Sequence, residues 1–347
     1  MAYHRKRMSL APALFTGVAG ALAYRAIRPL RPPETLDGKT VLVTGGSRGL
    51  GFAIAQEAAA RGARIAICGR DPSSLERARA VLADMGAPVA ALPCDVTDLA
   101  AVQLLVDTVG RALGEVDVLI NNAGVIQVGP AEEMTAADYA EAMAANFWGV
   151  VHSSLAVVPG MRARGSGWII NIASIGGRIS VPHLLPYGAS KFAAVGFSKG
   201  LRAELAPHGI RVVTVCPGLM RTGSPRNATF RGRHRREYAW FSIADSLPLL
   251  SVSAEWAARR ILDDAMRGAA EVTFPITMRA ASILEVAAPG LTSGVLTLAS
   301  RLLPRAPRHS SGARAGRESE SWLSPSLLTT LGDRAAARYN QIARDER

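Results

Sequence analysis

The stretch that decides the fold is TVLVTGGSRGLGFAIAQEAAARGARIAICGRD, residues 40–71. An apolar run is followed by a glycine-rich turn, a helical pattern and a second apolar run, which together predict a β-α-β unit. Glycines at positions 45, 49 and 51 let the backbone approach a pyrophosphate closely, and the following helix directs its N-terminus at that phosphate. Such a glycine pattern alone is weak evidence, but its position directly after the first strand predicts a dinucleotide-binding site.

Short apolar runs alternate with amphipathic stretches beyond this unit. Strands are expected at residues 40–44, 64–68, 88–92, 116–120, 167–173, 210–216 and 271–275. Helical patterns lie near residues 50–61, 73–85, 98–113, 135–164, 187–207 and 254–268. This alternation predicts a doubly wound α/β fold, with a parallel sheet of about seven strands and helices on both faces. One domain over residues 36–276 explains the whole pattern.

The net charge of +12 is unevenly distributed. Basic residues concentrate at 1–35, 226–237 and 301–347, and the remainder of the chain is nearly neutral. A nucleic-acid-binding domain would instead gather its basic residues on a folded face with recognisable reading elements. The distribution therefore argues against a nucleic-acid partner and suits an anionic membrane surface or simple solubility.

The cysteines are few and widely spaced. Cys68, Cys94 and Cys216 each lie in a β-like apolar run, which predicts buried free thiols rather than disulfides. The sequence has no cluster of histidines and cysteines, so no structural or catalytic metal is expected.

The first 35 residues form a separate segment. Met8 to Tyr24 is an uncharged stretch of about 17 residues, near the lower limit for crossing a bilayer, with basic residues on both sides. Three interpretations compete: a membrane anchor or interfacial helix, a cleaved signal peptide with Ala21-Leu22-Ala23 as its small-residue site, or a helix packed on the domain. The consecutive prolines of RPLRPP, residues 28–33, then predict an extended linker.

Residues 277–347 form a C-terminal extension that is predicted to be helical and basic, and in part disordered. Residues 277–303 are apolar with Gly and Pro interruptions, so helices packed on the domain or lying at a surface are expected. Arg279 and Glu285 argue against a second membrane span there. Residues 304–326 are rich in Arg, Ser, Gly and Pro, which predicts a mobile segment.

Three further features accompany the glycine turn: NNAG at residues 121–124, Ser174 thirteen residues before Tyr187, and Tyr187 four residues before Lys191. Together they resemble the short-chain dehydrogenase/reductase family in its single-domain form, over about residues 36–270. The resemblance implies a Rossmann-type fold and an enzyme that transfers hydride between a nicotinamide dinucleotide and a carbonyl or secondary alcohol. It also implies a homo-oligomer formed through the helices at 135–164 and 187–207.

Four residues match the catalytic set of that family. Tyr187 would be the general acid in carbonyl reduction or the base in alcohol oxidation, although an unperturbed phenol has a pKa near ~10. Lys191 lies one helical turn on, and its cation, with the positive nicotinamide ring of the oxidised cofactor, favours the phenolate. Ser174 would hydrogen-bond the substrate oxygen. Asn146 in MAANFWG matches the family's asparagine that holds a proton-relay water.

The cofactor-binding residues implied by the same resemblance follow the ends of successive strands. They are Thr44, Gly45, Ser47, Arg48, Gly49, Leu50, Gly51, Arg70, Asp95, Val96, Asn122, Ala123, Gly124, Tyr187, Lys191, Pro217, Gly218 and Thr222. An acidic residue at the end of the second strand would bind a ribose 2′-hydroxyl, but this chain has Arg70 there, with Arg48 in the glycine turn. Two guanidinium groups favour the 2′-phosphate of NADP over NAD, whereas Asp71 is a mild counter-signal.

Substrate specificity is expected in residues 219–253, which combine a basic cluster with Tyr238, Trp240 and Phe241. This segment is interpreted either as a lid or mouth over an apolar substrate or a membrane, or as a solvated basic loop whose aromatics pack onto the domain. Trp148, Leu184 and Leu185 flank the catalytic set and suggest an apolar pocket. A lipid-like ketone is therefore the expected small-molecule substrate.

Three hypotheses about function follow. The first is an NADP-dependent short-chain dehydrogenase/reductase, cytoplasmic and membrane-associated through its N-terminal segment. The second is a non-catalytic protein that binds NADP(H) as a regulatory or redox-sensing ligand on the same fold, although a sensor needs no activated tyrosine. The third is a basic membrane or nucleic-acid adaptor, for which the nearly neutral core offers no support.

Overall fold

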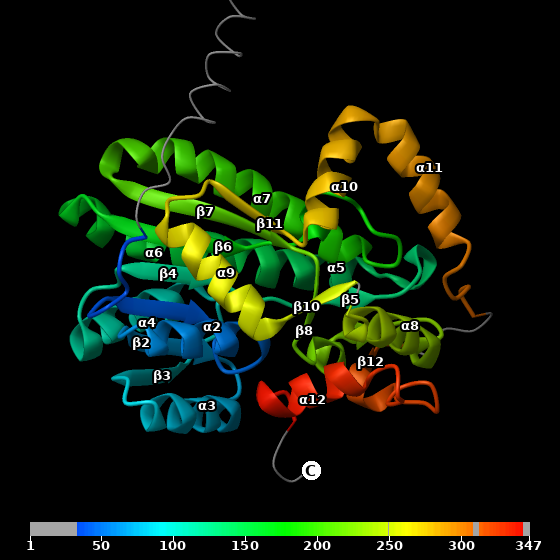
Figure 1. Cartoon of the computed structure of the whole chain (residues 1–347), viewed down its shortest axis with the longest axis horizontal. Coiled ribbons are helices and arrows are strands. Elements are labelled where there is room, and N and C mark those ends of the chain that lie inside the picture. Colours follow the sequence, from blue (N-terminus) through cyan, green and yellow to red (C-terminus); the bar gives the residue numbers. More distant parts are fainter. Residues whose placement is uncertain (1–32, 249, 308–311, 343–347) are drawn as a thin grey trace, which may run out of the picture.

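The computed structural model describes residues 33–248, 250–307 and 312–342. Its centre is a parallel sheet with the strand order β11-β7-β6-β4-β1-β2-β3 (Figure 1). The strands are β1 (Thr40–Thr44), β2 (Arg64–Gly69), β3 (Val89–Pro93), β4 (Val118–Asn121), β6 (Gly167–Ile172), β7 (Ile210–Pro217) and β11 (Glu271–Phe274). The predicted doubly wound Rossmann-type sheet of seven strands is confirmed.

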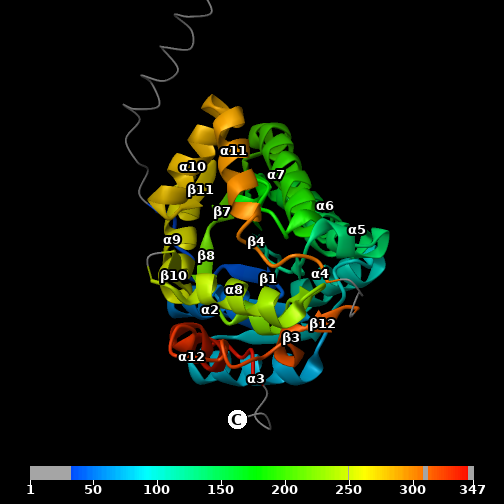
Figure 2. The same ribbon diagram turned by 90° about the vertical axis from the view of Figure 1, so that its right-hand side faces the viewer.

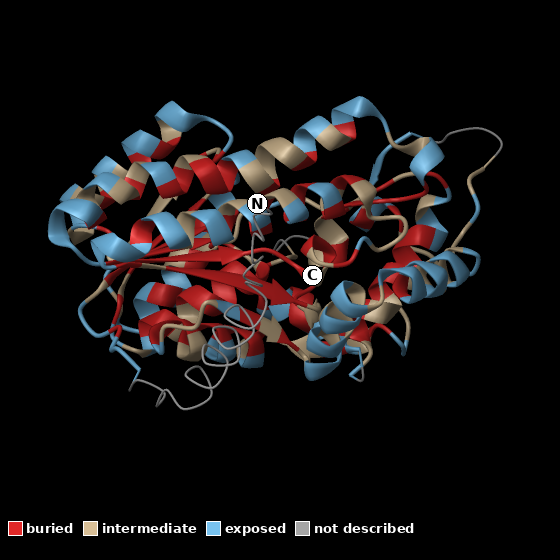
Figure 3. Cartoon of the chain, turned by 90° about the horizontal axis from the view of Figure 1, so that it is seen from above, coloured by how far each residue is buried: buried red, intermediate tan, exposed pale blue. Residues whose placement is uncertain are grey.

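Helices cover both faces of the sheet. The helices of this layered domain are α2 (Gly49–Ala60), α3 (Pro72–Asp84), α4 (Leu99–Leu113), α5 (Ala136–Met143), α6 (Gly149–Arg164), α7 (Leu185–Leu205) and α9 (Ala254–Met266). The apolar side chains of α2, α3 and α9 form one core cluster with one face of the sheet, and those of α4, α6 and α7 form a second cluster with the other face. Figure 3 shows the buried strands between helices whose outer sides are exposed.

Each central strand is apolar throughout because both of its faces are covered. In β1, the side chains of Val41 and Val43 belong to one core cluster and that of Leu42 to the other, and all three are at most 1 % exposed. Side chains of successive strand residues point to opposite faces of a sheet, so a strand buried on both faces reads as a continuous apolar run. The run in β1 therefore places the glycine turn at the carboxyl edge of a buried central strand.

The helix predicted over residues 135–164 is divided in the structure. A π-helical turn, η2 (Ala144–Trp148), separates α5 from α6. Such turns insert an extra residue into the helical ladder and are frequent at functional sites. The turn contains Asn146, one of the predicted catalytic residues.

The remaining elements of the domain are mostly short, and most of them lie between β7 and α9. They are β5 (Gln127–Val128), η1 (Ala131–Glu133), η3 (Ile175–Gly177), η4 (Ala206–His208), β8 (Leu219–Arg221), η5 (Ser224–Asn227), β9 (Thr229–Phe230), α8 (His234–Ser246) and β10 (Ser251–Ser253). Tyr238 and Phe241 on α8 are buried and pack edge-on against Phe230, while the Trp240 indole N–H donates to Glu237 Oε2 at 2.7 Å. These aromatics therefore pack onto the domain, as one of the two interpretations expected, but on a helix rather than a loop.

The C-terminal extension has two parts. Helices α10 (Ile276–Ala287) and α11 (Pro289–Ser300) project from the domain beside β11 (Figures 1 and 2). After residue 312 the chain returns to the domain as β12 (Arg314–Ala315), η6 (Gly316–Glu318) and α12 (Thr330–Arg338). Composition predicts mobility over 304–326, but the structure pairs β12 with β9 and buries Ser319 and Ser324 completely. The N-terminal segment Met8–Tyr24 lies outside the described residues.

Candidate active site

Tyr187 and Lys191 lie on one side of α7, near its N-terminus. Leu184 and Pro186 help to set that end of the helix, because the fixed φ of proline suits the first helical turn. The Lys191 ammonium is 5.7 Å from the centre of the Tyr187 ring, and it donates to the Ile172 carbonyl at 2.9 Å. The lysine is only 5 % exposed. The predicted i, i+4 spacing thus brings the phenol and the ammonium together.

Burial shifts both titrating groups away from their charged forms. It lowers the pKa of Lys191 to about 8. It also raises the pKa of Tyr187, which the hydrogen bond with Ser174 opposes. The expectation that the lysine cation and the positive nicotinamide ring of the oxidised cofactor together favour the phenolate stays a prediction. Among the groups of the protein itself, burial is the main cause of the raised pKa of Tyr187.

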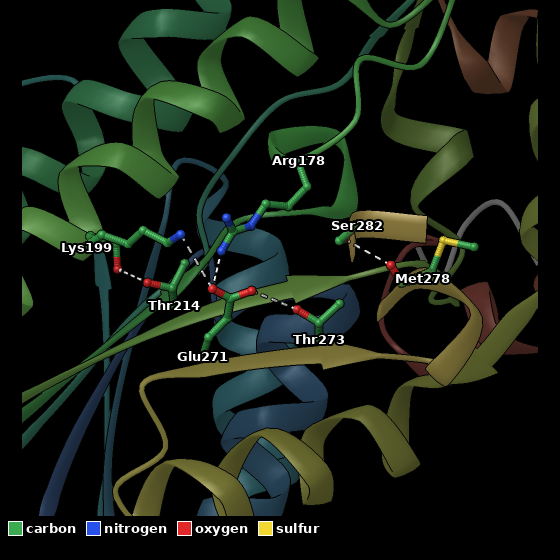
Figure 4. A network of polar contacts seen from close by, with 8 residues as sticks. Arg178, Lys199, Thr214, Glu271, Thr273, Met278 and Ser282 are labelled. Atoms are coloured by element: carbon green, nitrogen blue, oxygen red, sulfur yellow. Dashed lines mark hydrogen bonds and ion pairs between the residues drawn. The ribbon is translucent and has the colours of Figure 1, made fainter. Parts of the chain in front are cut away.

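Ser174 caps the 3₁₀ turn η3 directly after β6. Its hydroxyl accepts a hydrogen bond from the Gly176 N–H at 3.0 Å and faces Tyr187. Arg178 caps the other end of η3 and pairs with Glu271 on β11, and Lys199 on α7 lies 3.8 Å from the same carboxylate (Figure 4). This network connects the turn that carries Ser174 to the helix that carries Tyr187.

Asn146 is completely buried in the π-helical turn. Its side-chain amide donates to the Val125 carbonyl at 3.0 Å and to Ser190 Oγ at 2.9 Å, and its carbonyl accepts the Val125 N–H at 2.8 Å. A Cβ at Gly124 would collide with Asn146 Oδ1 and would lie 3.7 Å from Lys191 Nζ. Asn146 therefore sits beside the lysine and fixes the backbone after the NNAG motif.

A cavity of about 510 Å³ runs along the carboxyl ends of the strands. The predicted site residues line it, with the exception of Thr44 and Gly51. Thr44 instead joins β1 to the NNAG motif: its hydroxyl accepts the N–H groups of Asn122 and Ala123 at 3.0 and 3.1 Å. Gly51 is needed for close packing, because a Cβ there would collide with the Gly45 carbonyl.

The cavity fits a dinucleotide. Its volume lies in the range of about 300–1,000 Å³ that is usual for ligand sites. The first turn of α2 begins at its edge, where helical N–H groups have no partner within the helix and can bind phosphate. At Gly45, φ is +62° and a Cβ would lie 2.8 Å from Ala123 Cα, so only glycine lets this turn pack against the NNAG motif. Asp95 and Pro217 line the cavity at other strand ends.

Known protein families, sequences and structures that resemble this chain agree with this geometry. The family model for short chain dehydrogenases matches residues 39–230. D-threitol dehydrogenase of Mycolicibacterium smegmatis is 40% identical over 190 residues, which cover 54% of this chain and 72% of that protein. A dehydrogenase/reductase SDR family protein 7-like of Anopheles gambiae is 34% identical over 268 residues, or 75% of this chain and 83% of that one.

The chain belongs to the short-chain dehydrogenase family. A solved short-chain dehydrogenase/reductase from Burkholderia phymatum, in complex with NAD, superposes with a TM-score of 0.67 and 26% identity, over 74% of this chain and 96% of that one. The predicted family is thus confirmed. This short-chain dehydrogenase is an oxidoreductase that acts on a small molecule with a nicotinamide cofactor.

Some residues that line the site of this short-chain dehydrogenase fall outside the predicted set, among them Ile126, Ala145 and Gln341. Met220, Ser224, Asn227 and Ala228 belong to the segment 219–253, in which substrate specificity was expected. Ile126 and Ala145 lie close to predicted motifs and could have been found from the fold. Gln341 could not, because no local pattern connects the C-terminus to the glycine turn. Trp148, expected beside the pocket, is instead 50 % exposed and does not line the cavity.

The described residues of this short-chain dehydrogenase hold no group of three His, Cys, Asp or Glu side chains that could bind a metal ion. Cys68, Cys94 and Cys216 are free and buried, as the sequence predicts.

Proposed function

We propose that this short-chain dehydrogenase uses NADP(H) to interconvert a carbonyl and a secondary alcohol on an apolar, lipid-like substrate. The observation that carries the choice of NADP is the pair Arg48 and Arg70 at one end of the cavity. The pKa of Arg48 is lowered by burial and by the neighbouring Arg70, and raised by Asp71. Two adjacent cations that repel each other favour a doubly charged 2′-phosphate.

The Asp71 carboxylate already accepts other hydrogen bonds, which makes it a poor partner for a ribose 2′-hydroxyl. It caps α3, accepting the N–H of Ser73 at 3.0 Å and of Ser74 at 3.3 Å, together with both serine hydroxyls. These hydrogen bonds to Ser74 and Ser73 lower the pKa of Asp71. Because both carboxylate oxygens of Asp71 accept hydrogen bonds at the N-terminus of α3, Asp71 is only weak evidence for NAD over NADP.

In the reduction direction, the bound cofactor supplies the hydride that adds to the carbonyl carbon. Tyr187 supplies the proton to the carbonyl oxygen, and because burial raises the pKa of the phenol, it carries this proton before the reaction. Ser174 donates a hydrogen bond to the same oxygen as negative charge develops. Lys191 holds a positive charge close to the tyrosine and stabilises the phenolate that remains after proton transfer.

An apolar substrate is supported by the apolar residues that line the cavity, among them Val125, Ile126, Ala145, Met220 and Ala228. The proposed membrane association through the N-terminal segment is joined by a second apolar surface, because α10 and α11 expose apolar residues such as Ile276, Val286 and Val295. Among the described residues, no single helix could span a bilayer. The α10–α11 pair, bent by 120°, would meet the length and composition only when both helices are taken together.

A homo-oligomer is supported by Trp148, Leu155 and Phe192, which lie exposed on η2, α6 and α7. These are the helices through which the family resemblance implies assembly. An exposed apolar patch of this kind is typical of a protein interface.

The function is tested by incubating the purified protein with NADPH or NADH and a panel of apolar and polar ketones, with the product identified by mass spectrometry. We expect oxidation of NADPH with an apolar ketone and a lower Kd for NADPH than for NADH. Binding of NADPH without turnover on any ketone would instead support a regulatory protein. A preference for NADH would refute the assignment of NADP.

A further inference from the structure

The C-terminal arm, defined as residues 312–342, packs closely against the segment that follows β7. Strand β12 pairs with β9, and α12 lies beside α8 (Figures 1 and 2). Glycines make this approach feasible: a Cβ at Gly223 would collide with Ala336, one at Gly332 with Ser246, and one at Gly316 with the Pro225 carbonyl. The arm is therefore built against the domain at three separate places.

The end of the arm is bonded to the glycine-rich turn. The Gly49 N–H donates to the Tyr339 carbonyl at 2.8 Å. The Asn340 side-chain amide donates to the carbonyls of Ser47 and Ser74 at 2.8 and 2.9 Å, and its oxygen accepts from Arg77 Nε at 2.8 Å. Asn340 is 9 % exposed. The Asn340 side chain thus uses both of its N–H groups and one of its two oxygen lone pairs to hold the arm on the glycine turn.

The backbone at Asn340 favours this docking. Its φ is +57°, a left-handed conformation directly after α12 that asparagine tolerates better than most residues. The chain turns out of the helix there and carries the next side chain, Gln341, over the edge of the cavity that Gly49 and Leu50 also line.

Gln341 is oriented by a relay of hydrogen bonds. Its carbonyl oxygen accepts from Asn227 Nδ2 at 2.6 Å, and Asn227 Oδ1 accepts from Arg48 Nη1 at 3.1 Å. The NH₂ group of the Gln341 amide therefore points toward the glycine turn. A Cβ at Gly49 would lie 2.7 Å from Gln341 Nε2. The amide donor therefore lies beside the N-terminus of α2, where backbone N–H groups bind phosphate.

We propose that the C-terminal arm is part of the dinucleotide site, and that the Gln341 amide donates a hydrogen bond to the pyrophosphate of the bound cofactor. The proposal rests on the nicotinamide cofactor of the proposed function. Arg317 on η6 adds a positive charge near Arg48, and its repulsion contributes to the lowered pKa of Arg48. The arm thus brings both a hydrogen-bond donor and a cation to the phosphate end of the cavity.

The position of Gln341 determines which cofactors it affects. The pyrophosphate is common to NADPH and NADH, whereas the 2′-phosphate is not. Loss of the Gln341 amide is therefore expected to weaken binding of both dinucleotides by the same factor. A hydrogen bond to a charged group contributes enough for a loss of about tenfold in affinity.

The test measures the Kd of NADPH and of NADH for the full-length protein, for Gln341→Ala, and for Gln103→Ala, an exposed glutamine on α4 that serves as the matched control. Intrinsic fluorescence or calorimetry reports binding without catalysis, and thermal melting verifies folding. Asn340→Ala, which frees the end of the arm from the turn, is the second variant. We expect Gln341→Ala and Asn340→Ala to raise both Kd values about tenfold, with Gln103→Ala unchanged.

Each other outcome is decisive. Unchanged affinity in folded Gln341→Ala and Asn340→Ala would overturn the inference while leaving the proposed function intact. Tighter binding in either variant would show that the arm competes with the cofactor, and would also overturn it. Failure of the unaltered protein to bind either dinucleotide would overturn the proposed function and this inference together.

Discussion

Asp245 provides a quantitative test of how the segment after β7 is packed. This carboxyl group on α8 is 4 % exposed, its Oδ1 accepts the Met220 N–H at 3.3 Å, and its Oδ2 has no partner in the described part of the chain. Burial raises the pKa of Asp245 from 3.8 to about 7, although Met220 and Arg221 oppose the shift. The folded protein therefore holds a proton on Asp245 at pH values where the unfolded chain has already lost it.

The sign and size of the effect on stability follow from this shift. A carboxyl with a raised pKa contributes stability that is fully present below about pH 4 and is lost as the pH rises to about 7. Each pH unit between these values lowers the free energy of unfolding by about 1.4 kcal/mol, so the full loss is about 4 kcal/mol. Between pH 5 and pH 7 the loss is about 3 kcal/mol.

The substitution Asp245→Asn removes this proton linkage and preserves the shape of the side chain. Urea unfolding of both proteins at pH 5, 6, 7 and 8 gives the difference in their free energies of unfolding at each pH. We expect the variant to gain about 3 kcal/mol relative to the unaltered protein between pH 5 and pH 7, and no more above pH 8. Asp84→Asn, at an exposed carboxyl on α3, is the control for the chemical change from carboxylate to amide.

A difference between Asp245→Asn and the unaltered protein that stays constant from pH 5 to pH 8 would refute this reasoning. It would mean that the carboxyl reaches water or a cation in the folded protein, and that α8 is not packed over β8 as described.

Three further predictions concern the site. Arg70→Ala should raise the Kd of NADPH about tenfold and leave that of NADH unchanged, because the proposed function assigns its guanidinium to the 2′-phosphate alone; an equal loss for both cofactors would contradict this. Ser174→Ala should lower kcat/KM about 10²-fold with the Kd of NADPH unaltered, as measured by steady-state kinetics and calorimetry, and activity within a factor of three of the unaltered enzyme would count against its role. With the pKa of Tyr187 raised by burial, carbonyl reduction should stay constant from pH 6 to pH 9 while alcohol oxidation rises, and a reduction rate that falls steeply below pH 8 would argue against Tyr187 as the donor.

Much of the fold could be predicted because its strands are buried on both faces. The run at 40–44 has the same bounds as β1, and the helix expected at 254–268 is α9. A continuous apolar run or a helical stripe is a local signal, so it survives in the sequence whatever the tertiary contacts are. The π-helical turn at Asn146 gave no such signal, because the residues on each side of it read as one uninterrupted helix.

The candidate catalytic residues were identified by the resemblance of their order and spacing to the short-chain dehydrogenase/reductase family. The structure brings them together, with Tyr187 and Lys191 on one side of α7 and Ser174 just after β6. The environment of these groups was harder to predict. Whether the lysine cation or burial decides the pKa of Tyr187 depends on how far the surrounding side chains exclude water, which the spacing does not determine.

The docking of the C-terminal arm could not be predicted from the sequence, because it depends on contacts between residues about 290 positions apart, such as Asn340 with Ser47. Composition rich in Arg, Ser, Gly and Pro predicts mobility when a segment has nothing to bury. Here the glycines at 223, 316 and 332 let backbones approach closely, so the same composition serves packing. Glycine is therefore an ambiguous signal until its neighbours are known.

The central claim is that Tyr187 donates the proton during carbonyl reduction by NADPH. The most direct measurement compares single-turnover oxidation of NADPH by the unaltered enzyme and by Tyr187→Phe, with the ketone identified in the substrate panel and the Kd of NADPH measured for both. If Tyr187 is the donor, Tyr187→Phe should bind NADPH within twofold of the unaltered enzyme and oxidise it at least about 10²-fold more slowly. Oxidation by Tyr187→Phe within tenfold of the unaltered rate would mean that another group donates the proton.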